Sequence, residues 1–90
     1  MLFMVIERFK QPGGLAVYRR ARDQGRLLPE GLQYVASWVD VDFSRCFQLM
    51  ETENRDLFEA WVRQWQDLVE FEIIPVRGSA EASSVIAPQL

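Results

Sequence analysis

The chain opens on an uninterrupted apolar stretch, Met1 to Ile6, before Glu7 and Arg8 bring in charge. Successive side chains of a strand point to opposite faces of the sheet, so a strand that is apolar throughout is covered on both faces. The stretch therefore predicts a central strand that runs to about Phe9. It also predicts cover on the face away from the helices, and a second copy of the chain is the simplest cover.

Further along the chain, apolar residues recur at helical spacing in two segments and alternate with polar residues in the last strand. Loops rich in Gly and Pro separate these segments. The predicted elements are a helix over Leu15–Gln24, strands over Leu32–Val41 and Phe43–Thr52, a helix over Arg55–Gln66 that Asn54 caps, a strand over Val69–Val76, and a weak helix over Ala80–Ile86.

The order strand, helix, strand, strand, helix, strand is the split βαβ pattern. We therefore expect the α+β class, with a ferredoxin-like βαββαβ sandwich in which two helices lie on one face of a four-stranded antiparallel sheet. Residues 1–90 form a single domain, with residues 77–90 as a C-terminal tail. If a homodimer forms through the open sheet face, the two sheets would enclose a dimeric α/β barrel.

The two faces of the predicted hairpin around Asp42 differ in polarity. A short turn there predicts three facing pairs on one face, Trp38 with Arg45, Ala36 with Phe47, and Tyr34 with Leu49. This face is apolar at its centre, so we expect it under the helices. The other face carries Ser37, Cys46 and Gln48 and suits a cleft or a dimer interface. A one-residue change in turn length would reverse the pairing.

Composition narrows the functional classes. A hydrophobic fraction of 49% with 26% charged residues is typical of a globular domain. The net charge of −3 argues against nucleic-acid binding, which needs a basic surface. The apolar opening is too short for a membrane span, and no leader pattern is evident, so we expect a cytoplasmic protein with no membrane partner. The chain has one Cys, which excludes an internal disulfide, and no His.

Ser37, Cys46 and Gln48 are the candidate ligand-binding residues, because a hydroxyl and an amide in an apolar cleft could orient a small planar ligand. The same groups could equally form hydrogen bonds across a dimer interface. Cys46 is expected to be a buried structural thiol, since no cation shares its face. We therefore predict no catalytic residue.

The strand carboxylates are interpreted as solvated edge charges, because their positions are scattered. They are Glu7, Glu51, Glu70 and Glu72. Without histidine and with one cysteine, a single chain cannot assemble a closed nitrogen and sulfur metal site. We expect neither a metal nor a cofactor.

Several segments resemble a family of short bacterial proteins that is known only as a domain of unknown function. They extend over nearly the whole chain and are Met1-Leu2-Phe3-Met4-Val5, Leu28-Pro29-Glu30-Gly31-Leu32, Ser37-Trp38-Val39, Arg45-Cys46-Phe47-Gln48-Leu49-Met50-Glu51, Trp61 with Trp65-Gln66-Asp67-Leu68-Val69-Glu70-Phe71-Glu72, and Pro75-Val76. The resemblance implies a ferredoxin-like fold of the dimeric α/β-barrel type and no established activity.

More distantly, the architecture is similar to dimeric α/β-barrel proteins that include cofactor-free quinone-forming monooxygenases, muconolactone-type isomerases and stress-responsive domains. Fold alone does not establish chemistry. Members that bind haem or perform general-base chemistry commonly depend on a histidine, which this chain lacks. We therefore expect a binding or stress-associated module without turnover. The alternative is a cofactor-independent monooxygenase or isomerase that acts on a small aromatic or lactone substrate in the barrel cleft.

Overall fold

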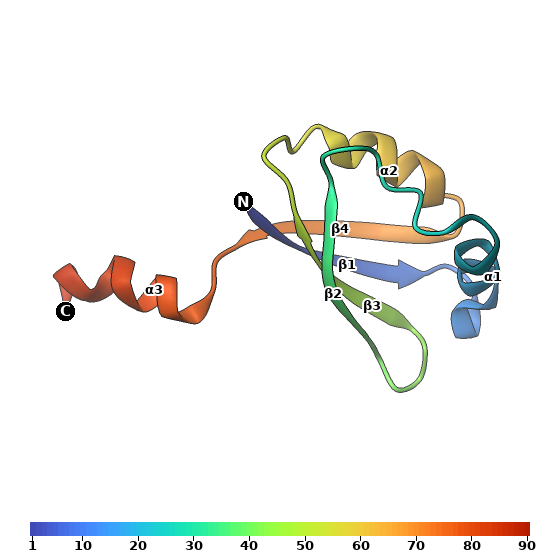
Figure 1. Cartoon of the computed structure of the whole chain (residues 1–90). Helices are drawn as coiled ribbons and strands as arrows, with labels where there is room; N and C mark the ends of the chain where they lie inside the picture. The colour runs from blue at the N-terminus through green and yellow to red at the C-terminus, as the bar shows by residue number, and fades with distance from the viewer.

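The computed structural model describes residues 1–90 and has the sheet that the element order predicts. Four antiparallel strands lie in the order β2-β3-β1-β4, with helices α1 and α2 on one face (Figure 1). This confirms the α+β, ferredoxin-like architecture. The strands are β1 (Leu2–Phe9), β2 (Gln33–Val39), β3 (Arg45–Glu51) and β4 (Val69–Val76), and the helices are α1 (Leu15–Gln24), α2 (Leu57–Trp65) and α3 (Ser79–Ile86).

The core lies between α2 and the centre of the sheet. Phe3 and Val5 of β1 are buried there together with Met50, which faces Phe3 across the β1–β3 pair. The helix contributes Phe58, Trp61 and Trp65, and Leu32 completes the cluster. The ring of Phe3 meets that of Phe58 edge to face with centroids 5.1 Å apart. Alternate residues of β1 therefore point under the helices, as the two-residue period of a strand requires.

The remaining residues of β1 point to the opposite face, which no helix covers. Two rows of apolar side chains cross the sheet there, and we call them the open sheet face: Met4, Ile6, Ala36, Trp38, Phe47, Leu49 and Ile74. The prediction that β1 is a central strand, apolar on both faces, is thus confirmed.

No helix has the length and apolar character that a bilayer crossing requires.

The hairpin register differs from the predicted one by two residues. Trp38 faces Phe47 rather than Arg45, because the turn spans residues 40–44 instead of a tight pair. Asp40 stabilises the longer turn by accepting hydrogen bonds from Ser44 Oγ at 2.9 Å and from Arg45 Nε at 2.7 Å. These two hydrogen bonds to one carboxylate stabilise the longer turn relative to a tight two-residue turn.

The expected assignment of the hairpin faces was wrong. The face of Trp38 is the uncovered one, and the face of Ser37, Cys46 and Gln48 lies under the helices, because Gln48 sits beside Val5 in the β1–β3 pair. The buried residues of α2 pack on Phe3 and Val5, so β1 decides which face the helices cover. The difference in polarity between the two hairpin faces does not decide which face is covered.

Tyr34 lies under the helices, as expected, but its partner differs from the predicted one. A bulge between Tyr34 and Ala36 shifts the register, so Tyr34 pairs with Met50. An extra residue in one strand moves every side chain beyond it to the other face. Tyr34 therefore joins the helix side of the sheet, whereas Trp38 stays on the open sheet face.

The two covering helices are attached differently. Helix α2 begins at Leu57, two residues later than expected, although the Asn54 side chain still accepts a hydrogen bond from the Asp56 N–H at 3.1 Å. Helix α1 has no buried residue. Its Arg20 instead binds Asp67 through two hydrogen bonds of 2.9 and 2.7 Å, just beyond the C-terminal end of α2. Helix α1 thus stands off the sheet and leaves space beneath it.

The C-terminal tail forms a helix that leaves the body of the molecule. Helix α3 corresponds to the weak helical signal and projects away from the end of β4 (Figure 1). It has no buried residue. Because of this projection the radius of gyration is 14.9 Å, whereas a compact chain of this length has about 12 Å.

Two adjacent glycines before α1 provide a matched test of how closely this segment packs on Phe9 of β1. Both have positive φ, +80° for Gly13 and +63° for Gly14, so alanine is strained at either position. Only at Gly14 would the added Cβ meet a neighbour, the ring of Phe9 at 2.7 Å. We expect Gly14→Ala to lower the free energy of unfolding by about 1–3 kcal/mol more than Gly13→Ala, the usual cost of overpacking. Urea unfolding of both variants measures the difference, and equal losses would contradict the Phe9 contact.

Candidate functional site

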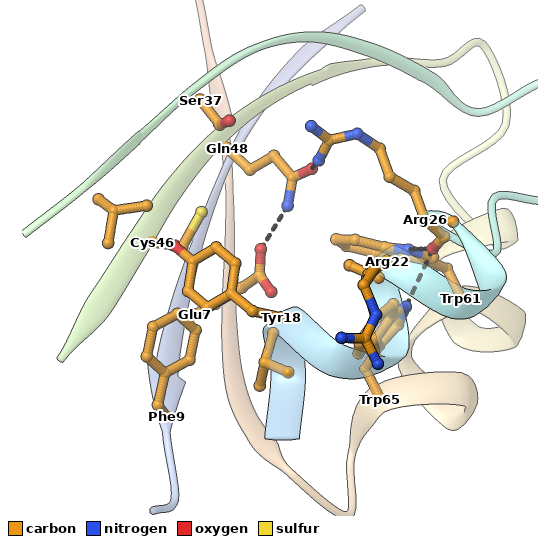
Figure 2. Close-up of a pocket in the computed structure, with 14 residues that line it drawn as sticks. Glu7, Phe9, Tyr18, Arg22, Arg26, Ser37, Cys46, Gln48, Trp61 and Trp65 are labelled. Atoms are coloured by element: carbon orange, nitrogen blue, oxygen red, sulfur yellow. Dashed lines mark hydrogen bonds between the residues drawn. The ribbon is translucent and has the colours of Figure 1, made fainter. Parts of the chain in front are cut away.

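A cavity of about 580 Å³ lies between α1 and the helix side of the sheet. It exists because α1 is held at its end and buries no side chain. Figure 2 shows the side chains that line it, and the three residues predicted to bind a ligand, Ser37, Cys46 and Gln48, are among them. The structure thus brings these three residues together, on the opposite face from the one expected. Their role in binding stays a prediction.

Glu7 lies at the base of the cavity and is 5% exposed. Its interpretation as a solvated edge charge was wrong. Burial raises the pKa of the Glu7 carboxyl from 4.5 to about 7, against the smaller opposing effects of Gln48, Cys46 and Arg26. A carboxyl in an apolar setting keeps its proton because the charged form loses its hydration. Glu7 is therefore poised to gain or lose a proton near neutral pH.

Gln48 connects this carboxyl to a cation. Its side-chain amide donates to Glu7 Oε2, and its Oε1 accepts a hydrogen bond from Arg26 Nη1 at 2.7 Å (Figure 2). Gln48 is 4% exposed, so its bond to Glu7 is formed away from bulk water, whereas Arg26 reaches the amide from the exposed side of the cavity. The amide separates the guanidinium from the carboxyl, and this separation lets the desolvation of Glu7 outweigh the attraction of Arg26.

The position of Arg26 is determined by its backbone. Its carbonyl accepts the indole N–H groups of both Trp61 and Trp65, each at 3.0 Å. The residues on either side have positive φ, +72° for Gly25 and +59° for Leu27. A left-handed leucine costs about 1 kcal/mol or more, so the surrounding contacts impose this conformation. The turn presents the Arg26 side chain to the cavity.

The guanidinium of Arg26 also lies over the ring of Tyr34, 3.6 Å from its centroid. This contact is possible because the β2 bulge turned Tyr34 toward the helix side. The Tyr34 hydroxyl is 2.8 Å from Ser37 Oγ. Stacking and the bond to Gln48 together fix a positive charge at one side of the cavity. Sequence patterns gave no indication of this role for Arg26.

Aromatic rings form the other walls. Tyr18 of α1 meets Phe9 and Phe43 edge to face, with centroids 6.3 and 6.1 Å apart. Phe43 belongs to the longer hairpin turn and has a φ of +58°, so the turn places its ring against α1. Phe9, Tyr18 and the two tryptophans of α2 line the cavity and give it flat apolar sides, and Phe43 packs against Tyr18 outside the lining. Such surfaces suit a planar ligand.

Cys46 is half-buried and lies beside Glu7 in the β1–β3 pair. Burial, together with the nearby Glu7, raises the pKa of its thiol to about 12, against a smaller opposing effect of Arg26. The thiolate is the reactive form, and it is almost absent at pH 7 under these conditions. Cys46 therefore acts as a small apolar wall of the cavity.

The site has the elements of ligand recognition and of proton transfer. It combines flat apolar walls, a fixed guanidinium, an amide and a carboxyl that titrates near neutrality. It does not have the elements of a metal centre, since no three metal-ligating side chains come together in the structure.

Comparison with known proteins gives one finding. The family model described as "Domain of unknown function (DUF3303)" matches residues 1–90. The chain belongs to this family. No curated protein and no solved structure matches the chain. The family therefore assigns no activity, and the functional argument rests on the cavity.

The burial of Glu7 makes stability depend on pH. The unfolded chain releases this proton near pH 4.5, whereas the folded chain keeps it until about pH 7. The free energy of unfolding should therefore fall by about 3 kcal/mol as the pH rises through this window, and stay level above it.

Glu7→Gln should remove this fall, because its amide stays neutral. The measurement is urea unfolding of both proteins across the window, and the difference between the two curves isolates Glu7 from Asp40 and Asp67, whose pKa values are lowered. Parallel curves for the two proteins would show that Glu7 is hydrated and titrates normally.

Proposed function

We propose that this protein is a binding module for a small planar organic anion, such as an aromatic carboxylate, held in the cavity under α1. The observation that carries the proposal is the buried Glu7, a protonatable carboxyl behind a guanidinium in an aromatic cavity. Burial of an ionisable group is costly, and groups with strongly shifted pKa values cluster at functional sites. A structural role alone would be served better by an apolar residue.

The charges of the cavity favour an anion. Arg22 and Arg26 both line it, and the carboxyl at its base is mostly neutral below pH 7. A carboxylate or phenolate oxygen can accept hydrogen bonds from Arg26 and from protonated Glu7, which then acts as a donor. The volume lies within the range of small-molecule sites.

Direct binding of simple probes tests the proposal. Benzoate and 4-hydroxybenzoate should quench or shift the fluorescence of Trp61 and Trp65, which line the cavity. Arg26→Met should weaken binding by about 10- to 100-fold, the value of a charge-assisted hydrogen bond. Arg19→Met is the matched control, because Arg19 is exposed on α1 and does not line the cavity.

The affinity for the anion should also fall as the pH rises, because Glu7 in the cavity loses its proton. Above about pH 7 Glu7 loses its proton and repels an anion, so the affinity should fall by about tenfold per pH unit. Glu7→Gln should flatten this profile. Failure of every aromatic acid to bind, or equal losses in the two arginine variants, would refute the proposal.

A second candidate is a cofactor-independent isomerase or monooxygenase acting on a small aromatic or lactone substrate. The observation that supports this candidate is the raised pKa of the Glu7 carboxyl, because a value of about 7 suits a general base at neutral pH. Both reactions begin when a base removes a proton from the substrate. Glu7 supplies that base without the histidine that the chain lacks.

Solvent exchange distinguishes the two functions. If Glu7 removes a carbon-bound proton, an activated ring or lactone bound in deuterated water should gain deuterium at that carbon, as seen by NMR. Glu7→Gln should abolish the exchange and leave probe binding in place below pH 7, where both side chains are neutral. If such compounds bind and none of them gains deuterium, the function is that of a binding module without turnover.

A further inference from the structure

The open sheet face has one apolar row that crosses all four strands and a second that crosses β2, β3 and β1 and ends at Glu72 of β4. One row joins Ala36, Leu49, Met4 and Ile74, and the next joins Trp38, Phe47 and Ile6. Trp38 is 56% exposed and Ile74 is 37% exposed. The arginines that border these rows are already paired, Arg8 with Glu72 at 3.2 Å and Arg45 with Asp40 at 2.7 Å.

The same chain carries a second uncovered apolar surface. We call residues 79–90 the C-terminal arm, which consists of α3 and the 3-10 turn after it (Ala87–Gln89), ending at Leu90. Ala82, Val85 and Ile86 follow one another at helical spacing on α3, with Ser83 and Ser84 on the other side. Val85 and Ile86 are 52% and 46% exposed. A helix this short is marginal in water without tertiary packing.

The amount of exposed surface fits a missing partner. The chain exposes 6124 Å², whereas a compact monomer of 10.5 kDa exposes about 5,400 Å². The excess, about 700 Å², approaches the roughly 800 Å² that each partner buries in a standard interface. Large contiguous apolar patches on a small protein mark an interaction site.

The dimensions of the two surfaces also correspond. The eight residues of α3 extend about 12 Å, and four strands span about 14 Å from the first to the last. The arm leaves the edge strand β4 and points away from its own sheet (Figure 1). An identical chain related by a two-fold axis would offer the arm the sheet that its own chain does not, and each chain would do this for the other.

We propose that two copies of this chain exchange their C-terminal arms, with α3 of each packed on the open sheet face of the other. The occupant of this face is thus a second copy of the chain. The apolar rows receive Val85 and Ile86, and the serines of α3 stay in water. The interface lies on the opposite side of the sheet from the cavity, so this proposal stands independently of the binding function.

The experiment compares the full chain with two arm variants by light scattering after size exclusion. Val85→Asp with Ile86→Asp removes the apolar side of α3, and Ser83→Asp is the control on its polar side. No arm residue belongs to the core, so all three proteins should fold, which far-ultraviolet circular dichroism checks. We expect the mass of two chains for the full chain and the control, and the mass of one chain for the double variant.

Iodide quenching of tryptophan fluorescence reports where the arm lies. Trp61 and Trp65 are buried, so quenching reports mainly on Trp38 of the open sheet face. The quenching constant should rise several-fold in the double variant and stay at the full-chain value in Ser83→Asp. A double variant that remains a dimer with Trp38 shielded would overturn the proposal. A monomeric full chain would also overturn it, and if its Trp38 were shielded, the arm would be folded on its own sheet.

Discussion

The backbone carbonyl of Arg26 is the contact on which the site depends. Two buried indoles of α2 donate to this one oxygen, so the chain that leaves α1 is bound to the helix that forms the core. The bonds satisfy two donors that would otherwise be buried without partners. They hold the turn in which Leu27 has a left-handed backbone, and from this turn the Arg26 side chain reaches Gln48. Core packing and site geometry therefore share the same atoms.

The protonation of Glu7 follows from this arrangement. Arg26 is the cation that acts on the carboxyl, yet its guanidinium stacks on Tyr34 and binds the amide of Gln48. The positive charge is thus held one side chain away from Glu7. A direct ion pair would have lowered the pKa of the carboxyl, whereas the interposed amide leaves burial as the dominant effect. A neutral acid and a fixed cation can then coexist in one cavity.

Sequence patterns predicted the element order, the central place of β1 and the ferredoxin-like sheet, because these depend on periodicity. They did not predict the turn at residues 40–44, which depends on individual hydrogen bonds of Asp40, or the bulge before Ala36, which breaks the two-residue period. Glu7 continues the alternation of Phe3 and Val5, so its face could have been inferred. Its burial could not, because it depends on how far α1 stands from the sheet.

The weak attachment of α1 to the core has a thermodynamic consequence. With no buried residue, it gains little from the core and is held mainly by Arg20 at Asp67 and by packing of Val17 and Ala21. Segments with few buried contacts open locally at a fraction of the global free energy. A ligand beneath α1 would add the apolar contacts that the helix lacks. Occupancy and helix order are then linked, so amide hydrogen exchange along α1 would slow as the cavity fills.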